Sequence, residues 1–297
     1  MKLSDFFSGN AVIRDGTFTH LDEGGTEFSG ALVYCQTLEF LRIARSNPNV
    51  AAILTTPELA EEVPSTTPCA TDPLPRSRFF QIYTDLSHAG RLEPPIDSPF
   101  GQGEDCRIHP SAVVSEKAVI GDRVIIGPNA VVESHCVIGD GTFVDAGVIV
   151  GGEGMMTVEV DGRRIRVPHA GGVSVGRDVI LLGNTVVVKS LFRKFTAIGD
   201  EAQIGVLANI GHGAQIGERC IIRGNCVISG RAIVQDRAVI ALSSTVVDAC
   251  TIGEDANVMM GSVVIKPVAA GEAVSGNFAY AHRRHVNHYL KDAQTDT

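Results

Sequence analysis

The sequence contains no tryptophan, and aromatic residues make up only 5% of its 297 residues. We therefore do not expect a conventional aromatic-rich core. No stretch approaches the roughly 20 consecutive apolar residues of a transmembrane helix, and the opening residues lack the apolar run of a signal peptide. We therefore expect a cytoplasmic protein without a transmembrane segment.

Basic charge is also scarce, with 25 Lys and Arg against 34 Asp and Glu and a net charge of −9. Broad binding of nucleic acid needs a basic surface, so we expect no nucleic acid partner. A hydrophobic fraction of 44% with 20% charged residues excludes a disordered chain, because enough apolar material is present to form a core.

The amino-acid composition of the chain changes near residue 104. Nine of the 13 prolines precede residue 100, and short units of aliphatic residues, Gly and Asp follow. In the first part, residues 37–46 have a helical pattern and residues 50–54 that of a strand. We predict a small α/β domain at 1–104, a repeat domain at 105–274 and a C-terminal helical extension at 275–297.

An aliphatic residue recurs every six positions through the repeat domain. The longest run without a slip is Ile198, Ile204, Ile210, Ile216, Ile222, Ile228, Val234, Ile240, Val246, Ile252, Val258 and Val264. Four positions after each of these stands a residue no larger than valine. This pattern is typical of a parallel β-helix of hexapeptide repeats, in which short strands stack coil upon coil. Ordinary strands with turns of varying length would lose the register sooner.

Two segments interrupt the period. Residues 151–172 form an excursion whose middle part predicts a hairpin around Asp161 and Gly162. Between Val187 and Ile198 the step is 11 residues rather than 12. Excursions from a solenoid usually line its binding surface, so both segments are candidates for the functional face.

Cysteine and histidine residues could bind a metal ion, but their spacing in this sequence does not favour a metal site. Cys136, Cys220, Cys226 and Cys250 fall in the small inward position, where free cysteine acts as a small apolar residue. No two histidines are spaced by five, the spacing seen in hexapeptide carbonic anhydrases. We expect neither a metal nor another cofactor.

His212 is the strongest catalytic candidate. It follows Ile210 by two residues and therefore points outward from the wall of the helix, between Gly211 and Gly213. Gly230 lies 18 residues on, one coil away if a coil takes three hexads. An imidazole that accepts a proton beside an amide that stabilises an oxyanion is a minimal acyl-transfer site. The alternative is a solvated surface histidine.

Several motifs, read together, resemble one family over residues 105–280. They are the entry at His109, the break at Gly151 with its hairpin ending at Ile165-Arg166-Val167-Pro168, the triplets Gly183-Asn184-Thr185 and Ile210-Gly211-His212, and Lys266-Pro267. The chain is similar here to the UDP-3-O-acylglucosamine N-acyltransferases of lipid A biosynthesis. The resemblance implies a left-handed β-helix, a homotrimer and an N-terminal domain that binds uridine.

The resemblance places the family's catalytic histidine on His212 and its oxyanion glycine on Gly230. It implies transfer of a 3-hydroxyacyl group from acyl carrier protein to the amine of a UDP-activated glucosamine derivative. We expect substrate contacts from Asn184, Asn209, Lys189 and Arg193, and an acyl chain near Met155 and Met156. For the basic residues of the C-terminal extension we expect a docking strip for an acidic carrier protein, the alternative being a solvated cap helix: Arg283, Arg284 and Lys291.

The chain also departs from the family. Ala249 stands where the family has a second histidine, Gly213 replaces an Asn, Val188 replaces an acid, and the family's uridine clamp is not found at 35–38. Two alternatives therefore stay open. One is a short-chain acyl-CoA-dependent N-acyltransferase of a nucleotide amino sugar for surface polysaccharide, and the other is a non-catalytic hexapeptide scaffold.

Overall fold

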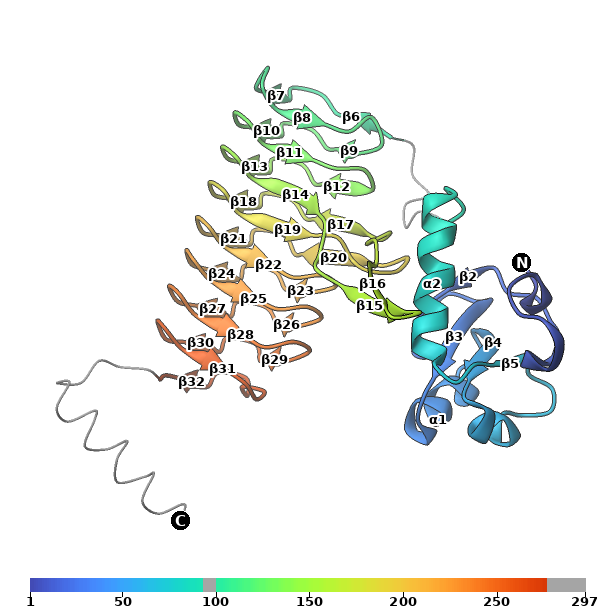
Figure 1. Cartoon of the computed structure of the whole chain (residues 1–297). Helices are drawn as coiled ribbons and strands as arrows, with labels where there is room; N and C mark the ends of the chain where they lie inside the picture. The colour runs from blue at the N-terminus through green and yellow to red at the C-terminus, as the bar shows by residue number, and fades with distance from the viewer. Residues whose placement is uncertain (93–99, 277–297) are drawn as a thin grey trace, which may run out of the picture.

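The computed structural model describes residues 1–92 and 100–276. Figure 1 shows a long stack of coils beside a smaller N-terminal domain, with one hairpin reaching from the stack toward that domain. No helix in the described ranges is long and apolar enough to cross a membrane. The predicted C-terminal helical extension lies outside the described residues, apart from its first two positions.

The N-terminal domain is a five-stranded sheet with a helix on each face. The strands run in the order β1 (Val12–Arg14), β5 (Cys69–Thr71), β4 (Val50–Thr55), β3 (Ala31–Cys35) and β2 (His20–Leu21). Leu41 of α1 (Leu38–Ser46) packs on one face, and Phe79 of α2 (Pro75–His88) packs on the other. Short 3-10 turns occupy Leu3–Asp5, Gly9–Ala11 and Pro57–Glu62. These elements form a small α/β domain.

From Gly101 on, apart from two segments that leave it, the described chain forms a triangular prism of parallel strands. Wall A contains β7 (Arg107–Ile108), β10 (Ile125–Ile126), β13 (Phe143–Val144), β18 (Ile180–Leu181), β21 (Gln203–Ile204), β24 (Ile221–Ile222), β27 (Val239–Ile240), β30 (Asn257–Val258) and β32 (Ala273–Val274). Wall B contains β8 (Val113–Val114), β11 (Val131–Val132), β14 (Ile149–Gly152), β19 (Val186–Val188), β22 (Asn209–Ile210), β25 (Val227–Ile228), β28 (Thr245–Val246) and β31 (Val263–Val264).

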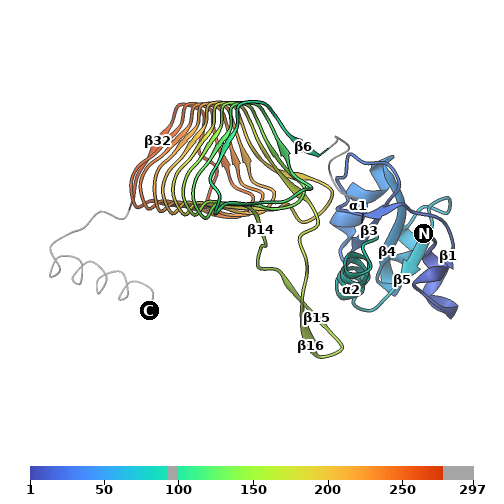
Figure 2. The same cartoon turned by 90° about the horizontal axis from the view of Figure 1, so that it is seen from above.

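Wall C completes each coil. It contains β6 (Gly101–Gln102), β9 (Val119–Ile120), β12 (Cys136–Ile138), β17 (Gly172–Val175), β20 (Phe195–Ile198), β23 (Gln215–Ile216), β26 (Ile233–Val234) and β29 (Thr251–Ile252). Seen from above in Figure 2, successive coils have similar outlines and each is displaced slightly from the one before. Because β6 already pairs with β9, the first coil begins at Gly101, a few residues before the predicted domain start.

The hexad period is confirmed by the strand register. Ile204 pairs with Ile222, and Ile222 with Ile240, so residues 18 apart are vertical neighbours. The twelve aliphatic positions from Ile198 to Val264 are all buried. The small positions fill the rest of the interior, and all four cysteines assigned to them are buried. The core is thus a column of stacked aliphatic side chains, each contributing about 1.5–3 kcal/mol on burial.

Both irregular segments leave the prism at the corner between walls B and C, which we call the site corner. The first carries the hairpin of β15 (Thr157–Val160) and β16 (Arg163–Arg166), with Asp161 and Gly162 at its turn. The second, residues 189–194, buries Leu191 and Phe192 against the N-terminal domain. In Figures 1 and 2 the hairpin and α2 lie on the same side of the prism. The site corner is therefore where the two domains meet.

Candidate functional site

His212 lies in the turn that connects β22 to β23 at the site corner. Its carbonyl oxygen accepts a hydrogen bond of 2.8 Å from the backbone N–H of Arg231 in the next coil. The N–H of Gly213 donates to Oγ1 of Thr196 at 2.8 Å, and that buried hydroxyl donates to the carbonyl oxygen of Val188 at 2.6 Å. The backbone on both sides of His212 is therefore fixed by neighbouring coils.

Gly230 occupies the same corner one coil further on, because Ile210 pairs with Ile228. A Cβ atom on Gly230 would lie 2.5 Å from Nε2 of His212 and 2.7 Å from Oδ1 of Asp248. Only glycine lets the imidazole approach the adjoining coil this closely. In the described part of the chain, no group accepts a hydrogen bond from the Gly230 N–H. Nε2 of His212 thus lies against the Cα of Gly230, whose N–H has no hydrogen-bond acceptor among the described residues.

The surroundings of His212 favour its neutral form. Burial lowers the pKa of His212 below its ordinary value of 6.5, and positive charge on His169 and Arg231 lowers it further. Asp248 and Glu23 act in the opposite direction but do not outweigh these effects. The His212 imidazole is therefore free to accept a proton at neutral pH, as a general base must be.

His169 adjoins His212 and was not singled out from the sequence. The two rings are 5.4 Å apart between centroids at an interplanar angle of 63°. His169 is only 2% exposed, and its backbone N–H donates to Oε2 of Glu153 at 3.2 Å. Both residues belong to the excursion at 151–172, where the hexad period is lost. The period therefore gave no signal that would place either of them at the site.

The basic residues proposed as ligand contacts are already engaged with acids or aromatic rings. Lys189 stands at the site corner one coil before His212, and its Nζ lies 2.9 Å from Oε1 of Glu153. The guanidinium of Arg193 lies over the ring of Phe28 at 5.2 Å from its centroid. Lys189 is thus brought to the site, whereas the guanidinium of Arg193 contacts the N-terminal domain.

The other predicted substrate contacts are spread over the surface. Asn184 lies in the turn between β18 and β19, at the corner between walls A and B, away from the His212 turn of the same chain. Asn209 is exposed on the outer face of wall B, three residues before His212. Met156 packs with the cluster that includes α2, whereas Met155 is 98% exposed.

The predicted carrier-docking residues Arg283, Arg284 and Lys291 lie outside the described residues. Within the described ranges, no group of three or more His, Cys, Asp or Glu side chains is arranged to bind a metal ion.

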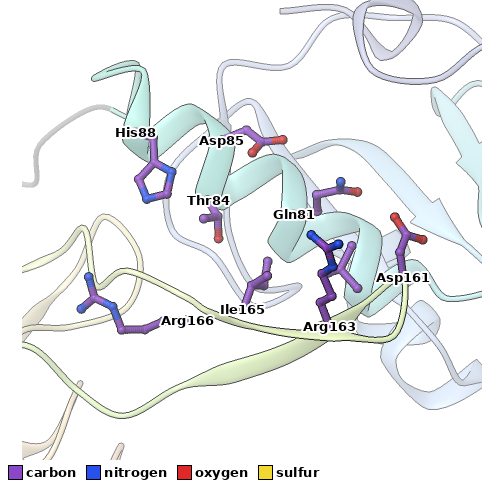
Figure 3. A pocket seen from close by; sticks show the side chains of 9 residues that line it. Gln81, Thr84, Asp85, His88, Asp161, Arg163, Ile165 and Arg166 are labelled. Carbon is purple, nitrogen blue, oxygen red and sulfur yellow. The ribbon is translucent and has the colours of Figure 1, made fainter.

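Two cavities adjoin the contact between the domains. The larger, of about 750 Å³, lies between α2 and the hairpin and is drawn in Figure 3; Gln81, Asp85 and His88 face Asp161, Arg163 and Arg166 across it. Neither His212 nor Gly230 lines this cavity. The smaller, of about 310 Å³, is lined by Glu23, Gly24, Gly25, Tyr34, Phe40, Ile43 and Arg231. Because Arg231 directly follows Gly230, this smaller cavity opens beside the His212 corner.

Comparison with known proteins gives the same architecture. Residues 103–134 and 195–230 match the family described as bacterial transferase hexapeptide (six repeats). The solved UDP-N-acetylglucosamine acyltransferase from Bacteroides fragilis aligns with a TM-score of 0.50 and 20% identity, over 59% of this chain and 66% of that protein. The chain is a left-handed parallel β-helix.

Two further solved structures align less closely. The UDP-N-acetylglucosamine acyltransferase from Francisella novicida has a TM-score of 0.39 and 21% identity, over 58% of this chain and 65% of that one. The perosamine N-acetyltransferase from Caulobacter crescentus, solved with CoA and GDP-perosamine, has a TM-score of 0.25 and 17% identity, over 82% and 92% of the two chains. The alignments with the two UDP-N-acetylglucosamine acyltransferases span just under two thirds of those proteins. No curated protein matches the sequence.

Proposed function

We propose that the protein is an N-acyltransferase that moves an acyl group from a thioester to the amine of a UDP-activated glucosamine derivative, in a pathway of the lipid A type. The observation that carries the proposal is the pairing of His212 with Gly230. A half-buried imidazole with a lowered pKa lies against a glycine whose N–H has no acceptor in the described chain. General-base catalysis and oxyanion stabilisation need these two groups.

The chemical steps follow from this pairing. Nε2 of His212 takes a proton from the acceptor amine as its nitrogen attacks the thioester carbonyl carbon. A C–N bond forms, and the N–H of Gly230 stabilises the oxyanion of the tetrahedral intermediate. The C–S bond then breaks, and His212 returns the proton to the departing thiolate. The products are an amide and a free thiol, and no cofactor is consumed.

We assign the acceptor's nucleotide to the smaller cavity. Tyr34 and Phe40 offer aromatic faces for a base, and Phe40 is 55% exposed although it is a large apolar side chain. Arg231 supplies positive charge for a diphosphate at the end of the cavity nearest Gly230. These residues come from β3, α1 and the site corner, and in this proposal they take the role of the family's uridine clamp.

The donor side of the proposal rests on the chemistry of the segments around the site corner. The acyl chain would pass Met155, an apolar side chain left almost wholly in solvent. The donor is an acyl carrier protein, an acidic partner that the basic residues Arg283, Arg284 and Lys291 would attract. A CoA thioester is the alternative donor.

The proposal includes a cytoplasmic homotrimer. An apolar column runs along the corner between walls A and B, where Val206, Leu242 and Met260 are each about half exposed. These residues stack at intervals of 18 or 36, and such a stripe is a suitable surface for packing one prism against another. Sedimentation of the full chain at assay concentration should give a trimer, and a monomer would contradict this part of the proposal.

Product analysis tests the proposed activity directly. The full chain is incubated with 3-hydroxyacyl carrier proteins and with short acyl-CoAs against a panel of UDP-amino sugars, and products are identified by mass spectrometry. An N-linked hydroxyacyl product supports the lipid A reaction, and a short-chain product moves the enzyme to the surface polysaccharide alternative. His212→Ala should lower turnover by about 10²-fold or more. Absence of transfer from every donor, or an unchanged rate in His212→Ala, would overturn the assignment.

A further inference from the structure

We propose that His169 is a positioning residue for His212: it holds the His212 ring edge-to-face from the hairpin side and opposes its protonation. The inference deepens the acyl transfer proposed above and rests on it for its catalytic meaning. The physical coupling between the two rings, however, is measurable without any substrate.

The two histidines reach each other from separate parts of the chain. His212 stands on the turn after β22, whereas His169 lies in the return segment between the hairpin and β17. Their rings meet at 5.4 Å and 63°, an edge-to-face arrangement of the kind that aromatic pairs favour. The return segment therefore limits the orientations available to the His212 ring.

The His169 ring is itself held on two sides, at each of its nitrogens. A Cβ atom on Gly154 would lie 2.5 Å from its Nε2, so the glycine backbone covers that edge. Nδ1 lies 3.7 Å from Oε2 of Glu153, and the same carboxylate accepts the His169 backbone N–H. Lys189 at 2.9 Å and Arg166 at 3.3 Å fix the Glu153 carboxylate in turn. The ring cannot swing away without breaking this arrangement.

The ring of His169 acts on His212 rather than on a substrate. Its side chain has no exposed surface, and neither ring nitrogen makes a hydrogen bond within the described residues. A buried imidazole without hydrogen bonds is unusual, because buried polar atoms are nearly always paired. Its nearest ionisable neighbours are Glu153 on one side and His212 on the other. The arrangement places an ionisable ring against the candidate base and shields it from water.

Charged groups face His212 from every element packed on it. His169 faces it from the return segment, Arg231 and Asp248 from the following coils, and Glu23 from the N-terminal domain. Arg231 and Asp248 lie 2.5 Å apart as an ion pair, so their opposite effects on His212 partly cancel. The electrostatic effect of His169 on His212 also disfavours a proton on His212. The lowered pKa of His212 has the direction that this arrangement predicts.

Glu153 is held in its charged form. Burial alone would raise the pKa of Glu153, but hydrogen bonds from His169 and Lys189 outweigh burial and lower it to about 2. The charged carboxylate therefore stays beside the His169 ring, with Oε2 at 3.7 Å from Nδ1.

The test compares His169→Phe with wild type in the full chain. Phenylalanine keeps an aromatic ring at the position but cannot carry charge. We expect the titration of the His212 imidazole, followed by NMR and assigned by its loss in His212→Ala, to move upward by roughly half a pH unit or more. The acid limb of kcat/KM should move by the same amount, with the KM for the acceptor little changed.

Two matched variants complete the design. His135→Phe removes another half-buried histidine, whose ring packs on Phe100 rather than on His212, and it should leave the His212 titration unchanged. His169→Gln has no ring and no charge but keeps a polar side chain within reach of Glu153; it should shift the titration in the same direction and serves where the Phe variant does not fold.

The possible outcomes separate this inference from the proposed function. An unshifted His212 titration in a folded His169 variant overturns the inference even if activity is lost, because that loss would then be structural. A shifted titration in a protein that transfers no acyl group keeps the coupling between the rings and overturns only the proposed reaction. A shift of equal size in His135→Phe also overturns the inference, since the effect would not be local.

Discussion

Gly230 determines how close the candidate base comes to the adjoining coil. Its missing side chain leaves the space that the His212 ring occupies, and the same space borders the Asp248 carboxylate. The glycine does not have a positive φ, so its requirement comes from the close approach of the ring rather than from backbone strain. The geometry of the site therefore requires a residue without a side chain at position 230.

Gly230→Ala should lower turnover by about 10²-fold, because a displacement of about 1 Å at a reacting group can have an effect of this size. The added Cβ would lie 2.5 Å from Nε2 of His212 and displace the ring. Gly183→Ala is the matched control, since its Cβ meets nothing closer than 3.5 Å at another corner of the prism. The measurement is the steady-state turnover of both variants, after each has been shown to be folded. Equal turnover in the two variants would contradict the role given to Gly230.

The pH dependence should follow the charges around His212. The active form is the neutral imidazole, so kcat/KM should be flat near neutrality and fall as the pH drops through the His212 pKa, which lies below 6.5. Asp248→Asn removes a negative charge that favours protonation and leaves Arg231 unpaired, so the acid limb should move to still lower pH. A shift toward higher pH would show that another group controls the limb.

At this scale the sequence predicts some site residues and not others. His212 and Gly230 were predictable because the 18-residue coil makes them vertical neighbours. His169 and Glu153 were not, since both lie in a segment where the period is lost and only the folded hairpin brings them to the corner. Asn184 was placed with the site from motif similarity, yet within one chain its turn belongs to a different corner.

Among the elements of the fold, the corner turns carry a repeated backbone strain. The third residue after many inward aliphatic residues has a positive φ, and at several corners it is not glycine. Leu207 has a φ of 59° and Ala249 a φ of 55°. A residue with a Cβ costs roughly 1–2 kcal/mol in this region, a cost that the stacked hydrogen bonds between coils offset.

Ala249→Gly should therefore stabilise the protein, by about 0.5–1 kcal/mol after the greater freedom of glycine in the unfolded chain is allowed for. Gly261→Ala is the reciprocal change, since Gly261 has a φ of 69° with no atom near its missing Cβ, and it should destabilise by a similar amount. Denaturant titration of both variants tests the pair. Shifts of the same sign would show that φ is not the controlling factor.

The strands of the three walls were predictable from the hexad period. For the irregular step, the period predicted its position in the sequence but not its structure. The step of 11 residues marks residues 189–194, but nothing in the spacing says that Phe192 leaves the prism to pack on another domain. Its ring meets Phe79, Phe80 and Tyr83 of α2. A local pattern reports the register of its own coil, and contacts with a separate domain are not periodic.

For the whole molecule, the contact between the domains has an apolar centre and a charged edge. The aromatic cluster is joined by a hydrogen bond from the Tyr83 hydroxyl to the carbonyl oxygen of Leu191. At the edge, Nζ of Lys194 lies 3.6 Å from Asp22 and 3.7 Å from Glu23. Glu23 also lines the smaller cavity, so the same contact that joins the domains completes the proposed acceptor pocket.

Phe192→Ala should weaken the contact between the domains more than it lowers the stability of either domain by itself. Loss of a buried phenylalanine costs about 3–5 kcal/mol, and the lost contacts here are mostly with α2. We expect calorimetry to show the N-terminal domain melting at a lower temperature while the β-helix transition stays in place. The KM for the nucleotide acceptor should rise because Tyr34 and Arg231 would no longer be held across one cavity, whereas kcat at saturation should change little.

Phe143→Ala, on the outer side of wall A, is the control and should alter neither the first transition nor KM. A single transition at the wild-type temperature in Phe192→Ala would mean that the two domains do not depend on this contact, and the acceptor pocket would then need another support.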